Sequence, residues 1–273
     1  MQEIFSKLNL DDHGIYRSKD TNSVAYPIIG NQDCFLLEDD SYWFKHRNQC
    51  ITSVISNHPP SGPIIDVGGG NGYVTRGILD AGFNAVLVEP GLSGATNGKI
   101  KREIPEVICA TFSNINFKAS SISAIGCFDV IEHIENDEEI IDDFFQKLKP
   151  GGLLYITLPA HKWLWSQSDV RAQHYRRYDR KQVEKLLSKR FEIIYFTYFF
   201  SLLLIPIFIF RALPYRLMGR KDSVLSRKTE HGTNKGIIAK LINYFLRREI
   251  KKLRNGRSIT YGASCLIVAR KIN

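Results

Sequence analysis

A glycine-rich turn between a strand-like run and a helix-like run most constrains how this chain can fold. The stretch IIDVGGGNGYVTRGILD runs from Ile64 to Asp80 and places glycines at positions 68, 69, 70 and 72. Glycine loses more backbone freedom on folding than any other residue, so such a cluster indicates positive φ angles or a close approach to the main chain. The amides at the start of the following helix favour an electronegative group. We therefore expect a ligand to lie against this turn.

Apolar runs alternate with amphipathic stretches on both sides of this turn. We expect strands at 63–67, 85–89, 107–111, 124–130, 153–158, 191–199 and 259–269, and helices at 73–81, 137–148 and 179–189. This alternation predicts an α/β fold with a doubly wound, seven-stranded, mostly parallel sheet and helices on both faces. In such sheets ligands bind at the carboxyl ends of the strands.

The spacing of the glycines excludes two common nucleotide-binding motifs. A GxGxxG pattern would need glycine at Tyr73 or Thr75, and no Gly-Lys-Ser/Thr follows that would make a phosphate-binding P-loop. Glu89, followed by Pro90, ends the next expected strand 17 residues after Gly72. An acid at this place can accept two hydrogen bonds from a ribose diol. The alternative is a solvated carboxylate at a strand end, but the pairing with the glycine turn favours ribose.

Four segments in this order resemble the class I S-adenosylmethionine-dependent methyltransferases. They are Asp66–Gly72, Glu89, Phe128–Asp137 and Leu148–Pro159. The resemblance covers roughly residues 42–199 and the final expected strand. It implies a Rossmann-like methyltransferase fold and an enzyme that uses S-adenosylmethionine.

The resemblance also implies which residues hold the cofactor. The glycine turn would pass beneath the methionine part, Asp66 would lie near the amino end, and Glu89 would bind the ribose hydroxyls. Thr111 and Phe112 fall where the family contacts adenine, although this chain lacks the acid often found there. The cofactor-binding residues expected on this basis are Asp66, Gly68, Gly69, Gly70, Gly72, Glu89, Pro90, Thr111, Phe112, Phe128 and Asp129.

A narrower resemblance points to a class of acceptor. Ser41–Gln49 and Leu158–Leu187 are similar to methyltransferases associated with bacterial cell-surface polysaccharide or lipid-linked glycan synthesis. This implies a small-molecule acceptor, either a glycan or a lipid-linked group. Methylation of RNA or protein, and a non-catalytic scaffold that only binds the cofactor, stay as alternatives.

Residues 159–178 show no helix or strand pattern and carry many aromatic and basic side chains. Long loops of this kind are usually functional or disordered, and the aromatic content argues against disorder. We expect the loop to roof the cleft and bind the acceptor; the alternative is a packed cover whose arginines pair with acids. The acceptor-binding candidates are Trp163, Trp165, Tyr175, Arg176, Arg177 and Tyr178.

Transfer of a methyl group to a hydroxyl is helped by a general base. His133 and His174 are the candidates, with Asp169 as the group that orients the base. Alternatively, His133 could only bond backbone at a helix start. No metal-ligand spacing stands out, so we expect no metal. The five scattered cysteines, at 34, 50, 109, 127 and 265, suggest buried free thiols in a reducing cytosol.

Basic residues are concentrated in one segment. Positions 211–257 carry 14 Lys or Arg and three acids, a net charge of +11, which leaves −2 for the rest of a chain whose total is +9. The preceding run Ile193–Phe210 has 18 uncharged residues, near the length of a membrane span. Pro206 interrupts it, and a crossing would separate the final strand from its sheet, so we expect no span.

A helix expected at Lys235–Asn255 combines an apolar stripe with basic side chains. Such a helix is typical of one that lies on an anionic bilayer; the alternative is a helix packed on its own domain with a solvated basic rim. No nucleic-acid module accompanies the patch, so we expect no nucleic-acid partner. The stripe consists of Ile237, Ile238, Leu241, Ile242, Phe245, Leu246, Ile250 and Leu253.

These patterns divide the chain into two parts. We expect a methyltransferase domain formed by residues 1–200 plus 258–273, and a helical apolar and basic insertion at 201–257. Residues 1–60 would form a helical lid in which Trp43, Phe44 and Arg47 cover the cofactor, unless the two aromatic residues only cap the sheet. We expect a cytoplasmic protein, with peripheral association at the inner face of the membrane as a hypothesis.

Overall fold

The computed structural model describes residues 8–18, 35–218 and 237–272. Their strands form one sheet of nine in the order β1-β2-β5-β4-β3-β6-β7-β9-β8. Strands β2 to β7 are parallel, whereas β1 is antiparallel to β2 and β9 runs antiparallel to both β7 and β8. The strands are β1 (Asn9–Leu10), β2 (Tyr16–Arg17), β3 (Ile64–Val67), β4 (Ala85–Val88), β5 (Val107–Cys109), β6 (Ile122–Phe128), β7 (Leu148–Pro159), β8 (Phe191–Phe199) and β9 (Ser264–Lys271).

The predicted α/β fold with a mostly parallel sheet is confirmed, but the strand count is nine and not seven. The two additional strands, β1 and β2, have two residues each and extend the edge beyond β5. They come from a segment that was expected to be a helical lid. Strands this short carry no readable alternation, which is why the sequence pattern did not reveal them.

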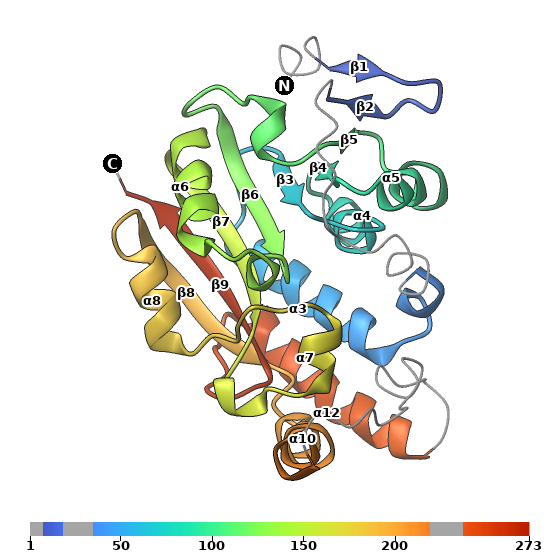
Figure 1. Ribbon diagram of the computed structural model, residues 1–273, viewed down its shortest axis with the longest axis vertical. Coiled ribbons are helices and arrows are strands. Elements are labelled where there is room, and N and C mark those ends of the chain that lie inside the picture. The colour runs from blue at the N-terminus through green and yellow to red at the C-terminus, as the bar shows by residue number, and fades with distance from the viewer. Residues whose placement is uncertain (1–7, 19–34, 219–236, 273) are drawn as a thin grey trace.

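Helices cover both faces of the sheet (Figure 1). Helices α6 (Asp137–Lys147) and α8 (Arg180–Leu187) pack on one face, and α3 (Tyr42–Asn57), α4 (Tyr73–Asp80) and α12 (Ile237–Arg254) pack on the other. Because water is excluded from both faces, every residue of β3 and β4 is buried, as their continuous apolar sequences predict. The remaining helices are α5 (Leu92–Thr96), α7 (Gln167–Arg171), α9 (Leu204–Ile207) and α10 (Leu213–Met218).

The segment 159–178 is more ordered than its sequence suggests. It contains a 3₁₀ turn at Lys162–Leu164 and the short helix α7, which begins with a capping box between Ser166 and Asp169. In a capping box the two residues satisfy each other's backbone amides at the start of a helix. Five residues are too few for an apolar period to appear, so the expectation of a loop without helix or strand was wrong here.

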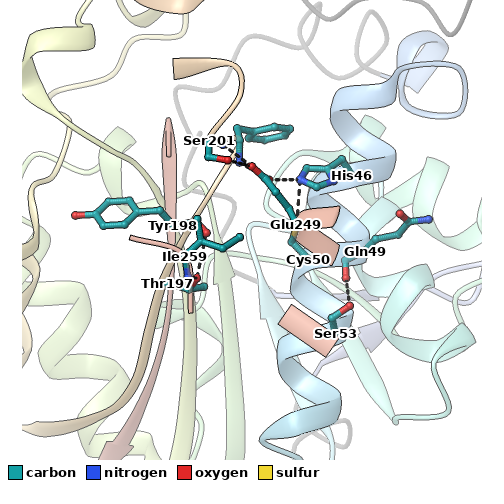
Figure 2. A network of polar contacts seen from close by, with 10 residues as sticks. His46, Gln49, Cys50, Ser53, Thr197, Tyr198, Ser201, Glu249 and Ile259 are labelled. Carbon is teal, nitrogen blue, oxygen red and sulfur yellow. Dashed lines mark hydrogen bonds and ion pairs between the residues drawn. The ribbon is translucent and has the colours of Figure 1, made fainter. Parts of the chain in front are cut away.

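A buried carboxylate fixes α12 to the rest of the fold (Figure 2). Glu249 of α12 accepts hydrogen bonds from His46 Nε2 of α3 at 2.8 Å and from the amides of Phe200 and Ser201 at 2.9 and 2.6 Å. Phe200, which follows β8, has a positive φ of 60°. Three elements that are distant in sequence therefore meet at one side chain, and the end of the insertion belongs to the same core as the sheet.

The described part of the apolar stripe of α12 packs mostly on the core, although Phe245 is 38% exposed. Leu246, Ile250 and Leu253 are buried in the core that contains α3, and Ile242 packs against it. The alternative of a helix packed on its own domain therefore holds for these residues; the side chains of residues 237–241, which include three stripe positions, lie outside the described part. None of the described helices has the length and apolar character that a bilayer crossing requires.

Candidate active site

A cavity of about 810 Å³ opens at the carboxyl ends of β3, β4, β5 and β6. This volume lies in the range of small-molecule and cofactor sites. Eight of the predicted site residues line it: Gly68, Gly70, Glu89, Pro90, Thr111, Phe112, Asp129 and His133. Five residues from one side of α6 and the turn before it also line the cavity and were not predicted: Asn136, Glu139, Ile140, Asp143 and Lys147. The sequence showed α6 to be amphipathic, but not that its polar side would meet the cavity.

The four glycines of the turn have two different structural roles. Gly68 and Gly70 line the cavity with φ angles of 69° and 56°, and a Cβ built on Gly70 would meet no atom within 4 Å. Gly69 and Gly72 lie against protein: a Cβ on Gly72 would sit 2.3 Å from Ile104 Cδ1, and one on Gly69 2.5 Å from a methyl carbon of Leu87. Gly70 therefore offers bare main chain to a ligand, whereas a Cβ on Gly68 would sit 2.7 Å from Val130 Cγ2, so Gly68 also allows close packing, as Gly69 and Gly72 do.

Glu89 is buried at the wall of the cavity and is held there by two backbone amides. Gly70 N and Gly91 N each donate to one of its carboxylate oxygens at 2.8 Å. Burial raises the pKa of Glu89 to about 7, and the two amides oppose this shift. Because each carboxylate oxygen can accept more than one hydrogen bond, both oxygens can still accept from a ligand diol.

Asp66 lies behind the glycine turn and is fully buried. The hydroxyl of Thr75 donates to its Oδ2 at 2.6 Å, whereas Oδ1 accepts no hydrogen bond from the described residues. Burial raises the pKa of Asp66 to about 6. An unsatisfied buried oxygen is costly, so a donor at the turn would complete this site. The cofactor implied by the resemblance carries such a donor in its amino group, and the diol acceptor, the bare turn and the cavity volume fit the rest of it.

Phe128, which was predicted to touch the cofactor, takes another position. Phe128 is buried in the core, and its carbonyl accepts a hydrogen bond from Arg47 at 2.9 Å. The neighbouring Asp129 lines the cavity with a φ of 56° and forms an ion pair with the same Arg47. Arg47 thus ties α3 to the rim of the cavity, while Trp43 stacks on Phe200 with ring centroids 3.8 Å apart and caps the sheet.

The structure brings the predicted catalytic group together. His133 lines the cavity, and its ring centroid lies 4.7 Å from that of His174. His174 Nδ1 lies 3.0 Å from Asp169 Oδ1, which is the contact that the predicted orienting role of Asp169 needs. Burial lowers the pKa of His133 to about 4, which makes its imidazole a weak base at neutral pH.

A fourth residue, Glu132, joins this group and was missed in the sequence. It is fully buried, and burial holds its pKa well above the ordinary value. One ligand atom from each of Glu132, His133 and His174 lies within 4.8 Å of the others. The sequence spacing did not reveal this group, because His174 lies some 40 residues away in the sequence and only the fold places it beside the Glu-His pair.

The predicted acceptor-binding residues divide into two groups. Arg176 pairs with Asp137 at 2.8 Å, Arg177 pairs with Asp169 at 2.7 Å, and the buried Tyr178 donates its hydroxyl to Asp137 at 2.8 Å. These three contacts favour the alternative of a packed cover. Among the described residues the cavity wall includes none of the six; Trp163 and Tyr175 are exposed on the outer side of the loop, and Trp165 is half-buried.

Comparison with known proteins agrees with this geometry. A family model described as a methyltransferase domain matches residues 42–193, which is more than half of the chain. A mitochondrial ubiquinone biosynthesis O-methyltransferase of Rattus norvegicus is 31% identical over 115 residues, 37% of this chain and 33% of that protein. The chain spans about a third to a half of the length of the curated relatives it matches.

Solved structures share the fold at low sequence identity. Phosphoethanolamine N-methyltransferase 2 of Haemonchus contortus, in complex with S-adenosyl-L-methionine, superposes with a TM-score of 0.55 and 16% identity over 91% of this chain and 58% of that chain. A SAM-dependent methyltransferase of Archaeoglobus fulgidus gives a TM-score of 0.54 and 14% identity over 87% and 99%. The match over residues 42–193, on a Rossmann-like sheet whose cavity fits the cofactor, shows that the chain belongs to the class I S-adenosylmethionine-dependent methyltransferases.

Proposed function

We propose that this chain transfers the methyl group of S-adenosylmethionine to a hydroxyl oxygen of a small acceptor carried on a lipid, with a glycan as the favoured head group. The rat relative is named as an O-methyltransferase, which supports oxygen as the accepting atom. The Haemonchus structure is of an enzyme with a small phosphorylated amine in its name, which supports a small acceptor. The case for a lipid comes from the surface of the insertion.

That surface is apolar, and we call it the insertion surface; it consists of Ile205, Ile209, Phe210 and Leu217. Ile205, Phe210 and Leu217 are 67%, 70% and 77% exposed, although they are large apolar residues. Exposed apolar groups that cluster in this way mark contact sites for membranes or other partners. Basic side chains lie exposed along the last turns of α12 and just after it: Arg247, Arg248, Lys251, Lys252, Arg254 and Arg257. Exposed apolar residues and exposed cations on the same insertion are complementary to an anionic bilayer.

The loop that was predicted to bind the acceptor packs directly on this insertion. The Trp163 ring meets Phe208 edge to face with centroids 5.4 Å apart, and Arg216 donates to the Trp163 carbonyl at 2.9 Å. Helix α7 contacts the π-helical segment Phe208–Ala212 of the insertion, and α7 and α10 lie toward the same end of the molecule (Figure 1). An acceptor whose lipid rests on the insertion surface would therefore meet the loop before it meets the cavity. This continuity is the observation that carries the proposal.

The residues of the cavity account for the chemistry that such a transfer needs. When bound, S-adenosylmethionine supplies a methyl carbon that an oxygen attacks while the carbon–sulfur bond breaks with its electrons on sulfur. Glu89 and the backbone of Gly68 and Gly70 fix the position of the cofactor, which converts the transfer into an oriented reaction. The Arg47–Asp129 ion pair fixes Asp129, which lines the cavity, to α3.

Vesicle flotation tests the lipid part of the proposal. Wild-type protein is expected to float with vesicles that contain anionic phospholipid and to stay in solution with neutral ones. A Phe210→Ser, Leu217→Ser double variant should lose most of this binding. Leu10→Ser is the matched control, because Leu10 is 59% exposed on β1, outside the insertion surface. Equal binding of the double variant and the wild type would overturn the membrane assignment.

A labelling experiment separates the acceptor classes. Cell-envelope lipid, total RNA and total protein are each incubated with the enzyme and S-adenosylmethionine labelled in its methyl group. Label in the lipid fraction that is released with a glycan upon mild acid treatment supports the proposal. Label in RNA or protein supports the second class of methyltransferase, and cofactor binding by calorimetry without any labelled product supports the scaffold; either result overturns the proposal.

A further inference from the structure

We propose that Glu132, His133 and His174 bind a divalent transition-metal ion at the edge of the cofactor cavity. The three side chains offer one carboxylate oxygen and two imidazole nitrogens, and these atoms lie within 4.8 Å of one another. Ligand atoms about 2.0–2.2 Å from one ion lie at most about 4.2 Å apart, so small side-chain rotations would close the site. The proposal that an ion binds depends only on these three residues. The role of the ion in methyl transfer depends in addition on the proposed function.

Both imidazole rings are held as metal ligands usually are. A histidine that binds a metal through one nitrogen commonly bonds a carboxylate or a backbone carbonyl through the other. His174 Nδ1 bonds Asp169 Oδ1 at 3.0 Å, which leaves Nε2 available. A ring nitrogen of His133 bonds the backbone of Ala172, so this ring is also oriented by a backbone contact. Asp169 is itself fixed by Arg177 at 2.7 Å, so this orientation is set before any ligand arrives.

Glu132 provides the second, independent observation. Its side chain is fully buried, and Oε2 accepts no hydrogen bond from the described residues. The two other carboxylates near it have cationic partners, Arg47 for Asp129 and Arg177 for Asp169. An unpaired buried carboxylate is strongly unfavourable unless a proton or a cation compensates it. A metal ion at the two histidines would supply that cation.

The donor set selects the kind of ion. Imidazole nitrogens suit zinc, cobalt, nickel and iron, whereas magnesium and calcium prefer oxygen ligands throughout. Glu132, His133 and His174 supply one oxygen and two nitrogens, so a transition-metal ion fits this donor set better than Mg²⁺ or Ca²⁺.

The position of the site allows a bound ion to contact the acceptor. His133 lines the cavity beside Asp129, Val130 and Ile134, so an open coordination position would face the space between cofactor and acceptor. A bound cation lowers the pKa of a hydroxyl that coordinates it, and the proton then leaves to solvent without a strong base. An acceptor oxygen would be oriented by the same contact.

Metal titration of the full-length chain tests the site without relying on activity. After removal of metal with EDTA, Co²⁺ is added and its visible absorption is followed; Zn²⁺ binding is measured by calorimetry with excess Mg²⁺ present. We expect about one ion per chain and no competition from Mg²⁺. Glu132→Gln and His174→Gln should each weaken binding by at least about tenfold, and Asp169→Asn by about 10- to 100-fold. His13→Gln, which changes an exposed histidine far from the site, is the control.

A stability measurement covers the case in which a variant folds poorly. Zn²⁺ should raise the melting temperature of the wild type and of His13→Gln, because a ligand that binds only the native state stabilises it, and should not raise that of His174→Gln. If the wild type binds neither ion, or if the ligand variants bind as it does, Glu132 is compensated by a proton and the site is disproved. Calorimetry with S-adenosylmethionine on the metal-free chain tells this failure apart from failure of the methyltransferase function.

Discussion

Two residues at the cavity, Glu89 and Gly70, are already positioned to contact a ligand. Glu89 receives two amide bonds before any diol arrives, and Gly70 keeps a positive φ with open space in front of it. The sequence was sufficient to find both, because a glycine cluster after one strand and an acid after the next define the same edge of the sheet. It was insufficient for Glu132, since a buried carboxylate has no recognisable pattern and its partner His174 comes from a distant loop.

Glu89 should make cofactor affinity depend on pH. Its pKa of about 7 means that the cofactor-free carboxyl is half-protonated near neutrality, and the diol is accepted best by the ionised form. Affinity for S-adenosylmethionine should fall as pH decreases from about 8 to 6, by up to about tenfold per unit below the pKa. Calorimetry at three pH values measures this.

A variant that lacks the Glu89 carboxylate provides the control. Glu89→Gln should weaken binding about 10- to 100-fold at pH 8, since hydrogen bonds to a charged group contribute about 1.5–3 kcal/mol, and should flatten the pH profile. Asp66 titrates one unit lower, at about 6, so a shallow residual slope is expected. A variant that keeps the wild-type profile would contradict the assignment of Glu89 to the diol.

The glycines of the turn should separate binding from stability. Gly72→Ala places a Cβ 2.3 Å from Ile104 at a φ of 78°, so it should lower the free energy of unfolding by more than the strain of about 1–2 kcal/mol from the left-handed conformation. Gly70→Ala meets open space and should cost little beyond that strain, but it should reduce cofactor affinity. Urea unfolding and calorimetry on both variants measure this; equal stability losses would contradict it.

At the scale of helices and strands, tertiary contacts determine the packing of a helix, which its local sequence pattern does not. Helix α8 was expected at 179–189 and occurs at 180–187, because Asp179 and Gln182 form the capping box that the sequence displays. The stripe of α12 was equally clear, but periodicity alone does not tell whether a helix packs on its own core or on a bilayer. Leu246, Ile250 and Leu253 pack on the core, whereas Phe245 of the stripe is partly exposed, and further exposed apolar residues lie in the segment from α9 to α10, at positions 205, 209, 210 and 217.

The junction of α12 with α3 and β8 should be a major source of stability. Glu249→Gln removes the charge that binds His46 and the amides of Phe200 and Ser201, and should lower the free energy of unfolding by about 2–3 kcal/mol. Glu184→Gln is the matched control, because its bond to Arg180 is exposed and contributes at most about 0.5 kcal/mol. Urea unfolding compares the two variants, and similar losses would contradict the role given to Glu249.

This junction also has a defined pH dependence. Burial alone would raise the pKa of Glu249, but the hydrogen bonds from His46 and Ser201 hold it below its ordinary value. A depressed folded pKa contributes stability above the unfolded pKa, near 4.5, and loses it as pH falls through the folded value. The stability difference between wild type and Glu249→Gln should therefore shrink below about pH 4.5.

At the scale of the whole molecule, charge is distributed very unevenly. Residues 211–257 carry +11 and the remainder −2, so any binding to anionic vesicles should be sensitive to salt. Raising NaCl from about 0.05 M to about 0.5 M shortens the screening length from about 14 Å to about 4 Å and should release most of the protein. Flotation across this series measures it; binding that is unchanged by salt would show that the apolar residues act alone.

Two neighbouring residues of helix α3 contact different parts of the molecule. His46 joins α3 to the insertion through Glu249, and Arg47, the next residue, joins it to Asp129 at the mouth of the catalytic cavity. Neighbouring side chains on a helix cannot move independently of its backbone. If the insertion tilts when the enzyme settles on a lipid surface, α3 would carry Arg47 and its contact with Asp129 along, so membrane binding and a change at the rim of the cavity would be coupled.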